Sequence, residues 1–277
     1  MKLNELLKKH DFKFSKKYGQ NFISEQNLLE KIVNGSGVTE NDVVLEIGCG
    51  AGTLTKELCK KAKFVYGYEI DKTLAPVLKE NLSGIENCEI TFRDIMREKT
   101  AELEKRLGGE YTIVANLPYY ITSPLIMKFV EQSQNCKAIV VMVQEEVADR
   151  ICALPATAEY GAITAGINAV CDSEKLFFVS REIFYPRPNV DSAVVKITFN
   201  KQKLNIKSRE IYRETVRAAF SSRRKTLANN LITAMKFTRE QAESLLSECG
   251  ISPLTRGETL SAEQFAVLSN AIYDLRA

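Results

Sequence analysis

The sequence contains no tryptophan and a single histidine, His10, among its 277 residues. One histidine argues against a Ser-His-Asp triad and against a histidine-rich metal site. The seven cysteines are scattered, odd in number and never spaced as C-x-x-C. We therefore expect neither a disulfide framework nor a metal centre, and we expect the protein to work in the reducing cytoplasm.

Long apolar runs are also missing from the sequence. No 18 consecutive residues are apolar, so we expect no membrane-spanning helix and no membrane partner. The amino-terminal residues 1–20 are basic but lack the apolar centre and the cleavage site of a signal peptide. The apolar fraction of 45% is nevertheless ample for a buried core.

Positive charge is concentrated at the two ends of the chain. The net charge is only +3, yet residues 1–18 carry +4 and residues 201–277 carry +5, which leaves about −6 for the middle. This distribution indicates either a polyanion gripped by two basic segments or two solvated, lysine-rich surfaces. Charge alone favours neither interpretation.

Short runs rich in β-branched residues alternate with helical patterns from residue 43 onward. This alternation predicts a parallel, doubly wound α/β sheet. Two later runs, 175–180 and 190–200, are joined by a proline-containing segment with no room for a long helix, so they predict an antiparallel hairpin at one sheet edge. The runs predicted to form the parallel strands are 43–48, 64–70, 88–94, 111–117 and 137–144.

After residue 200 the strand signal disappears and only helical patterns remain. Ser261 stands at the start of the last of them and, with Gln264 three residues later, predicts a helix N-cap. We expect one domain over residues 1–204 and a small helical domain over residues 205–277. The predicted helices of this second domain are 208–221, 223–236, 238–249 and 261–275.

A glycine-rich turn follows the first predicted strand. Gly48, Gly50 and Gly52 form G-x-G-x-G, and glycine lets the backbone turn sharply and approach a ligand without a clash at Cβ. The G-x-G-x-x-G spacing of dinucleotide sites is not met, because Thr53 stands where the third glycine would be. Glu46, just before the turn, suits a positively charged ligand better than phosphates.

Acidic side chains end the next two predicted strands. Glu69 lies about 20 residues after the glycines, where an acid can bind two ribose hydroxyls. Asp94 ends the third strand and can reach the same crevice. Each feature alone is weak, because a glycine turn can be only a tight turn and acids often cap strand ends. Together and in this order, they predict a nucleoside ligand without phosphate.

This combination resembles the class I S-adenosylmethionine-dependent methyltransferases. In that superfamily the acid after the second strand holds the ribose, and the acid after the third holds the adenine amino group. The resemblance implies these roles for Glu69 and Asp94. It also implies S-adenosylmethionine as the cofactor and S-adenosylhomocysteine as its product, with no metal.

The fourth predicted strand ends in "NLPY", residues 116–119. An exocyclic adenine amine is a poor nucleophile, because its lone pair is delocalised into the ring. Hydrogen-bond acceptors aimed at its N–H protons would stabilise the charge that develops as a methyl group arrives. The Asn116 side-chain oxygen and the Leu117 carbonyl can supply them. Pro118 fixes the turn, and Tyr119 can stack on an extruded base. The alternative is a capped strand end with packed tyrosines, but its place beside the glycine turn favours a pocket.

Longer segments resemble one family. "NLPY" is similar to the motif of amino-group methyltransferases, and "YGQNFI" (18–23) resembles the cofactor-contacting segment of the rRNA adenine N6,N6-dimethyltransferases. "QEEVADRI", "FYPRPNVDSAVV" and "AFSSRRKTLANNL" resemble the small-subunit, KsgA-type members of this rRNA adenine dimethylase family. The resemblance implies a class I methyltransferase fold with a carboxy-terminal helical domain.

The same resemblance implies an activity and its partners. Two methyl groups would be transferred to N6 of each of two adjacent adenosines near the 3′ end of 16S rRNA, as a step in ribosome biogenesis. The implied partners are 16S rRNA and the small ribosomal subunit, and we expect the protein to act as a monomer.

Site residues are implied in the same way. The target pocket would contain Asn116, Leu117, Pro118 and Tyr119, with Phe184 opposite Tyr119. The residues implied to contact the cofactor are Gln20, Asn21, Ile23, Glu46, Gly48, Gly50, Gly52, Glu69, Ile70, Asp94, Ile95 and Asn116.

Two basic clusters are predicted to bind RNA. Arg223, Arg224 and Lys225 stand at the start of the predicted helix 223–236, where positive charge opposes the helix dipole. That arrangement indicates a phosphate partner, although a solvated first turn is the alternative. The amino-terminal cluster includes Lys16 and Lys17.

One loop departs from the family pattern. Ala156 and Ala158 stand where many members carry glycine and lysine. The missing lysine implies that this loop grips RNA more weakly, without any consequence for the reaction.

Three alternatives remain open from the sequence. A large-subunit rRNA adenine N6-methyltransferase, which confers macrolide resistance, shares "QNF" and Asn-x-Pro-Tyr but fits "VDSAVV" and "RRKTLANNL" less well. A DNA adenine methyltransferase would need a target-recognition insert, which the sequence does not show. A non-catalytic assembly factor of the same fold would have no need to keep Glu69, Asp94, Asn116 and Tyr119 together.

Overall fold

A computed structural model describes residues 3–15, 19–200 and 203–276, with the side chain of Asn4 left out. Contacts divide the chain into two compact units. We call Met1–Ala148 with Glu174–Thr198 the sheet unit, and Asp149–Ser173 with Phe199–Ala277 the helical unit. The domain boundary at residues 204/205 stays a prediction, and the contact-based division differs from it by grouping residues 149–173 with the carboxy-terminal helices.

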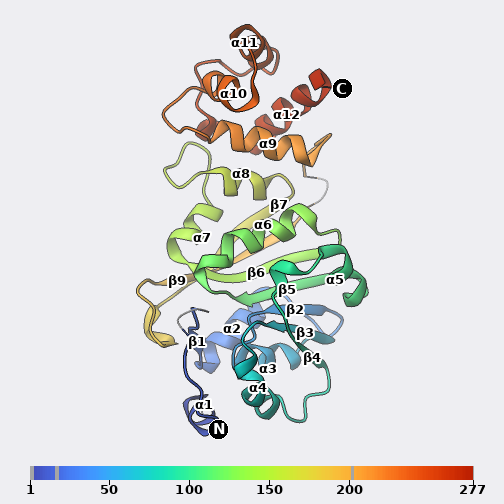
Figure 1. Ribbon diagram of the computed structural model, residues 1–277, viewed down its shortest axis with the longest axis vertical. Helices are drawn as coiled ribbons and strands as arrows, with labels where there is room; N and C mark the ends of the chain where they lie inside the picture. The colour runs from blue at the N-terminus through green and yellow to red at the C-terminus, as the bar shows by residue number, and fades with distance from the viewer. Residues whose placement is uncertain (1–2, 16–18, 201–202, 277) are drawn as a thin grey trace. The chain divides into compact units, whose positions relative to one another are not determined.

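A mostly parallel sheet of seven strands organises the sheet unit, in the order β4-β3-β2-β5-β6-β9-β7 (Figure 1). β2 is parallel to both β3 and β5, and β6 is antiparallel to β9. The prediction of a doubly wound, mostly parallel sheet is therefore confirmed, and β9 and β7 lie together at one edge. The strands are β2 Val43–Ile47, β3 Phe64–Glu69, β4 Cys88–Phe92, β5 Tyr111–Asn116, β6 Cys136–Gln144, β7 Cys171–Val179 and β9 Ser192–Phe199.

A second, two-stranded sheet was not predicted from the sequence. β1 (Phe22–Ile23) pairs antiparallel with β8 (Phe184–Tyr185) and ties the amino-terminal segment to the connection between β7 and β9. The helices up to residue 168 are α1 Leu3–Lys9, α2 Gln26–Ser36, α3 Thr53–Cys59, α4 Ala75–Asn81, α5 Thr100–Leu107, α6 Thr122–Gln132, α7 Glu145–Ile151 and α8 Ala162–Asn168.

Two clusters of buried side chains hold this sheet between helices. One joins leucine and isoleucine residues of α2 and α3 to valines that share one face of β2, β3, β5, β6 and β9. The other joins α1 and α4 to Phe22 and to Cys49, which follows β2. Apolar side chains on successive parallel strands form such continuous faces because both faces of a parallel sheet are covered.

Four helices follow residue 203 in the helical unit, as predicted: α9 Arg209–Ala219, α10 Leu227–Met235, α11 Arg239–Glu248 and α12 Ala262–Arg276. The predicted N-cap at Ser261 is confirmed, since its hydroxyl accepts from Gln264 N and the Gln264 side chain accepts from Ser261 N. The predicted start of α10 at residue 223 is wrong. Thr226 accepts from Asn229 N and begins the helix at Leu227.

None of the described helices is long and apolar enough to cross a membrane.

Close packing of β3 against the glycine turn sets the geometry of this region. Gly67 lies in the middle of β3, and a Cβ there would come within 2.5 Å of both Cys49 Sγ and Ile90 Cδ1. Glycine at this position therefore lets the turn after β2 settle directly onto β3.

We predict that Gly67→Ala lowers the free energy of unfolding by about 1–3 kcal/mol, because an extra methyl group overpacks a filled site. Gly109→Ala is the matched control, since a Cβ at position 109 meets no atom within 4 Å. Urea unfolding of both variants measures the effect. Equal stability of the two variants would contradict the packing argument.

Candidate active site

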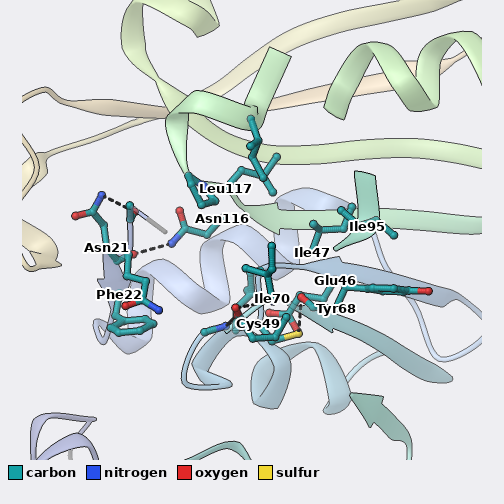
Figure 2. A pocket seen from close by; sticks show the side chains of 18 of the residues that line it. Asn21, Phe22, Glu46, Ile47, Cys49, Tyr68, Ile70, Ile95, Asn116 and Leu117 are labelled. Atoms are coloured by element: carbon teal, nitrogen blue, oxygen red, sulfur yellow. Dashed lines mark hydrogen bonds between the residues drawn. The ribbon is translucent and has the colours of Figure 1, made fainter. Parts of the chain in front are cut away.

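A pocket opens over the carboxyl ends of β2, β3, β4 and β5 in the sheet unit. Ligands of open α/β sheets bind at this edge, since the loops that follow parallel strands converge there. Figure 2 shows side chains from the amino-terminal segment, the glycine turn and the end of β5 around one pocket. The predicted residues that line it are Gln20, Asn21, Ile23, Glu46, Gly48, Gly50, Glu69, Ile70, Asp94, Ile95, Asn116, Leu117, Pro118 and Tyr119.

The glycine turn docks on the end of β3. The amides of Gly48 and Cys49 both donate to Tyr68 O, at 2.8 and 3.3 Å. Gly48, Gly50 and Gly52 all have positive φ, between 56° and 79°, which glycine adopts without strain. Gly52 itself does not line the pocket but ends the turn as the N-cap of α3.

Glu69 is held by three backbone amides. Its Oε2 accepts from Gly50 N at 2.8 Å, and its Oε1 accepts from Ile70 N and Asp71 N at 2.8 and 2.9 Å. Burial raises the pKa of Glu69, although these amides act in the opposite direction. The carboxylate is therefore fixed directly beside the glycine turn, where hydroxyl groups of a ligand could reach it.

Glu46 is the least solvated acid of the pocket. It is only 1% exposed, and its Oε2 has no hydrogen-bond partner within the described chain. Burial raises the pKa of Glu46 to about 7, although the side chains of Thr55 and Cys49 act in the opposite direction, and the nearby carboxylate of Glu69 adds to the rise. A buried carboxyl oxygen without a partner is costly, and a positively charged ligand would compensate it.

Asp94 begins a short loop at the other end of the pocket. Its Oδ1 accepts from Met96 N at 2.9 Å and thereby caps a single 3₁₀ turn, Ile95–Arg97. Its Oδ2 also lies 3.5 Å from Arg97 Nε. The buried Ile95 and the partly exposed Met96 form an apolar wall next to this acid, as a flat ring would require.

Asn116 is oriented by a residue that lies 95 positions earlier in the chain. Its Nδ2 donates to Asn21 O at 3.1 Å, a contact drawn as a dashed line in Figure 2. Because the amide nitrogen is engaged there, the Oδ1 atom remains as the acceptor that this side chain offers to the pocket.

Tyr119 follows Asn116 on the same wall. Its hydroxyl lies 3.0 Å from Ser192 Oγ at the start of β9, so the far end of the ring is anchored. Phe184, predicted to stand opposite, is 5% exposed and belongs to the buried core cluster rather than to the pocket lining. Its role in binding the target base stays a prediction.

The amino-terminal segment closes one side of the pocket. Gln20 is fixed at both ends of its amide, since Nε2 donates to Asp71 Oδ2 at 2.6 Å and Oε1 accepts from Ser15 N at 2.9 Å. Thr53 Oγ1 donates to Ile23 O at 2.9 Å. These contacts connect residues 20–23 to the start of α3 and to the segment that follows β3.

Several lining residues were not predicted from the sequence. The Phe22 ring is the clearest case, because a Cβ on Gly50 would lie 2.7 Å from it, so the ring and the turn touch directly. The aromatic residue inside "YGQNFI" was the only available signal. The other unpredicted residues include Cys49, Thr53, Tyr68, Arg93, Met96 and Tyr120.

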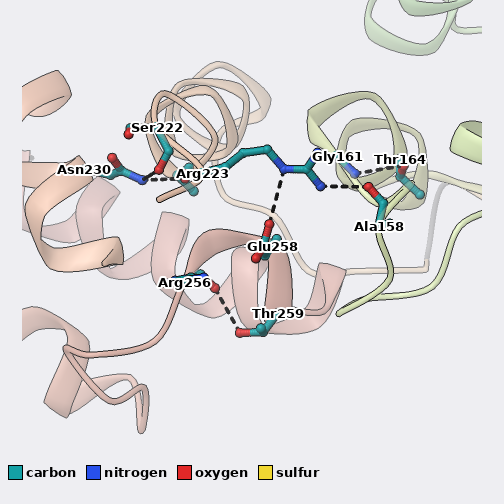
Figure 3. A network of polar contacts seen from close by, with 10 residues as sticks. Ala158, Gly161, Thr164, Ser222, Arg223, Asn230, Arg256, Glu258 and Thr259 are labelled. Carbon is teal, nitrogen blue, oxygen red and sulfur yellow. Dashed lines mark hydrogen bonds and ion pairs between the residues drawn. The ribbon is translucent and has the colours of Figure 1, made fainter. Parts of the chain in front are cut away.

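The predicted RNA-binding cations of the helical unit separate into two kinds. Arg223 is engaged within the unit, because its guanidinium donates to Ala158 O at 2.8 Å and pairs with Glu258 Oε2 at 3.3 Å (Figure 3). Arg224 and Lys225 are exposed in the turn that precedes α10. The three cations therefore do not form a first helical turn. Lys16 and Lys17 lie outside the described residues.

The loop that contains Ala156 and Ala158 includes a backbone conformation that favours glycine. Ala156 has a φ of +67°, in the left-handed region that glycine adopts more easily. Its amide donates to Glu258 O at 2.9 Å. Ala158 contributes its carbonyl oxygen to Arg223, which any residue type could supply.

The sheet order, the glycine turn and the acids at successive strand ends define a class I methyltransferase. No group of histidine, cysteine and acidic residues suited to a metal ion occurs in the described part of the chain. The model of the ribosomal RNA adenine dimethylase family matches residues 11–274, and the chain belongs to this family.

Relatives and solved structures agree with this assignment. The chain is 44% identical over 271 residues to "Ribosomal RNA small subunit methyltransferase A" of Clostridioides difficile strain 630, covering 97% of this chain and 94% of the relative. The protein of the same name from Caldanaerobacter subterraneus is 46% identical over 264 residues, covering 94% and 98%.

Two solved structures are similar over most of the chain. A dimethyladenosine transferase from Plasmodium falciparum is 26% identical with a TM-score of 0.76, covering 89% of this chain and 95% of that one. The 23S rRNA methyltransferase ErmE is 26% identical with a TM-score of 0.69, covering 91% and 100%.

The buried Glu46 predicts a pH-dependent stability. Its folded-state pKa of about 7 lies above the ordinary value of 4.5, so its favourable contribution is complete below pH 4.5 and is lost as the pH rises through 7. Glu46→Gln, which cannot ionise, should therefore gain up to about 3 kcal/mol over the wild type between pH 5 and pH 8. Urea unfolding of both proteins at these two pH values measures the gain, and a difference that does not change with pH would refute it.

Proposed function

We propose that this chain binds S-adenosylmethionine in the pocket and dimethylates N6 of two adjacent adenosines near the 3′ end of 16S rRNA. This proposal assigns it a role in ribosome biogenesis, with S-adenosylhomocysteine as the product. Its partners are 16S rRNA and the small ribosomal subunit, and we further propose that it acts as a monomer in the cytoplasm. Membership of the rRNA adenine dimethylase family and the names of the relatives support the proposal.

The pocket residues fit this cofactor in charge and shape. When bound, S-adenosylmethionine supplies a methyl group activated by a sulfonium cation. Glu46 would complement positive charge with its unpartnered oxygen. Glycine at position 50 lets the turn lie against the Phe22 ring, because a Cβ there would come within 2.7 Å of that ring. Glu69 would accept from ribose hydroxyls, and Asp94 from the adenine amino group.

The observation that carries the proposal is the orientation of Asn116. Its Nδ2 is bound by Asn21 O, so its Oδ1 is available to accept from the N6 amine of the target adenosine. An acceptor at this position stabilises the charge that develops on nitrogen during transfer. The Leu117 carbonyl would be the second acceptor, and no strong base is required because the methylated amine loses its proton to water.

Tyr119 supplies a stacking surface for the extruded base. Its hydroxyl is held by Ser192 Oγ, so the ring does not need to be ordered when the base arrives. Pro118 fixes the turn between the acceptors and this ring through its restricted φ of −56°.

The small-subunit target is favoured over the large-subunit alternative. The two relatives named for the small subunit are 44% and 46% identical, against 26% for the 23S rRNA methyltransferase. Methyl transfer from labelled S-adenosylmethionine should therefore label undermethylated small subunits. Label confined to large-subunit rRNA would overturn this choice, and failure to bind the cofactor would favour a non-catalytic assembly factor.

We predict that Asn116→Ala lowers the rate of methyl transfer at least about 10²- to 10³-fold, since it removes one acceptor from the transition state. The affinity for S-adenosylmethionine should stay nearly unchanged, as measured by calorimetry. Asn116→Asp is the matched variant, because it keeps an acceptor oxygen but loses the donor to Asn21 O. It should retain more activity than Asn116→Ala, and equal turnover in the wild type and the alanine variant would remove the acceptor role.

Binding to RNA should depend steeply on salt. We predict that Arg224→Ala makes the slope of log K against log salt less negative by about one, as expected for the loss of one phosphate contact. Arg239→Ala is the control, because Arg239 is exposed in the same unit but pairs with Glu243 at 3.2 Å. Filter binding to 16S rRNA over a range of salt concentrations measures both slopes, which should differ. Identical slopes would argue against a phosphate contact by Arg224.

A further inference from the structure

Lys128 on α6 ends its side chain in a nest of three backbone carbonyls. Its Nζ donates to Ile95 O at 2.8 Å, to Met96 O at 3.2 Å and to Glu98 O. An ammonium group has three N–H donors, and one short loop offers a carbonyl acceptor for each of them. Charge-assisted bonds of this kind are stronger than bonds between neutral groups.

The loop that Lys128 holds is one wall of the cofactor pocket. Asp94, Ile95 and Met96 line the pocket, and Figure 2 shows Ile95 facing it. Asp94 caps the amino end of the 3₁₀ turn through Met96 N, and Lys128 caps its carboxyl end through the carbonyls. Both ends of the turn are thus closed by side chains of opposite charge, which suits the helix dipole.

The surroundings of Lys128 act on its pKa in two directions. Its side chain is half-buried, and burial lowers the pKa of Lys128, whereas the carboxylates of Asp94 and Glu98 act in the opposite direction. Replacing Lys128 by an apolar residue would remove the ammonium group from all three carbonyls.

A second contact from the same helix supports this arrangement. Gln132 lies one helical turn after Lys128 on the same face of α6, and its Oε1 accepts from Thr100 Oγ1 at 2.9 Å. α6 begins at Thr122, directly after the turn that contains Tyr119. One rigid helix therefore connects the loop at the adenine end of the pocket to the segment that carries the acceptor for the target amine.

We propose that Lys128 is a positioning residue that sets the adenine-binding loop, Asp94–Glu98, in its ligand-ready conformation. This inference rests on the proposed function, because it takes Asp94 and Ile95 as the residues that contact the adenine of the cofactor. Lys128 touches neither cofactor nor target base, and it acts only through the backbone of this loop.

An ammonium suits the nest better than a guanidinium does. Three carbonyls converge on one point, whereas the five donors of arginine lie in one plane on a larger group. Lys128→Arg should therefore restore the charge without restoring all three bonds. Lys128→Gln keeps a donor but lacks both the reach and the charge.

Calorimetric titration with S-adenosylhomocysteine tests the inference. Lys128→Met should raise the dissociation constant about tenfold, which is the size of one or two lost bonds to a pocket loop. Lys128→Gln and Lys128→Arg should lie between Lys128→Met and the wild type. In methyl transfer, KM for S-adenosylmethionine should rise by the same factor, while kcat at saturating cofactor and KM for RNA stay within about twofold.

Lys137→Met is the matched control, because Lys137 is a partly exposed lysine of the sheet unit that pairs with Asp42 at the other end of the strands. Its affinity for S-adenosylhomocysteine should equal that of the wild type. A Lys128→Met protein with unchanged affinity, or with reduced kcat at unchanged affinity, would overturn the positioning role. If that variant does not fold, the comparison of Lys128→Gln with the wild type decides in the same way. Failure of the wild type to bind would instead refute the proposed function.

Discussion

The pocket depends on how the glycine turn after β2 docks on the end of β3. Gly48 N and Cys49 N share the carbonyl of Tyr68, and Gly50 N donates to the Glu69 carboxylate. The backbone of the turn has positive φ angles at Gly48, Gly50 and Gly52, which glycine adopts without strain. Since β2 is also parallel to β5, the same docking brings the end of β5 beside the turn.

This arrangement places acids where they destabilise the fold. Glu46 and Glu69 are both buried beside the turn, and burial raises the pKa of each carboxyl group, that of Glu46 to about 7. Glu69 is compensated by three backbone amides, but Glu46 Oε2 has no partner among the described residues. A buried acid without compensation is difficult to explain by stability alone, and sites that bind charged ligands tolerate such strain.

Much of the fold and part of the site could be predicted, because their signals are local. Runs of β-branched residues predicted the parallel strands, and glycine and acidic residues at the strand ends predicted the positions of Glu69 and Asp94 at one sheet edge. The contacts of Phe22 and Lys128 could not be predicted in this way. They depend on a two-residue strand pairing across the chain and on carbonyls 30 to 33 residues away, which leave no periodic pattern in the sequence.

The basic cluster of the helical unit was predicted in the first turn of a helix, whereas it lies in the turn before α10. The helical pattern continues upstream of α10, but Thr226 caps the helix and leaves Arg223 free to reach Ala158 O and Glu258. A helix beginning at residue 223 would have placed three cations against the positive end of its dipole. The observed turn avoids this conflict. All three cations are exposed, but Arg223 is bound to Ala158 O and to Glu258.

The contact between Arg223 and Ala158 O also helps to hold the loop that contains Ala156 and Ala158. Ala158 has no cationic side chain, yet its carbonyl oxygen accepts from the guanidinium of Arg223. The position of this loop within the helical unit is therefore maintained by backbone atoms, through Ala156 N to Glu258 O as well as through Arg223. The side chain of Ala158 takes part in neither contact, so the residue type at this position alters the surface of the loop and not the bonds that hold it.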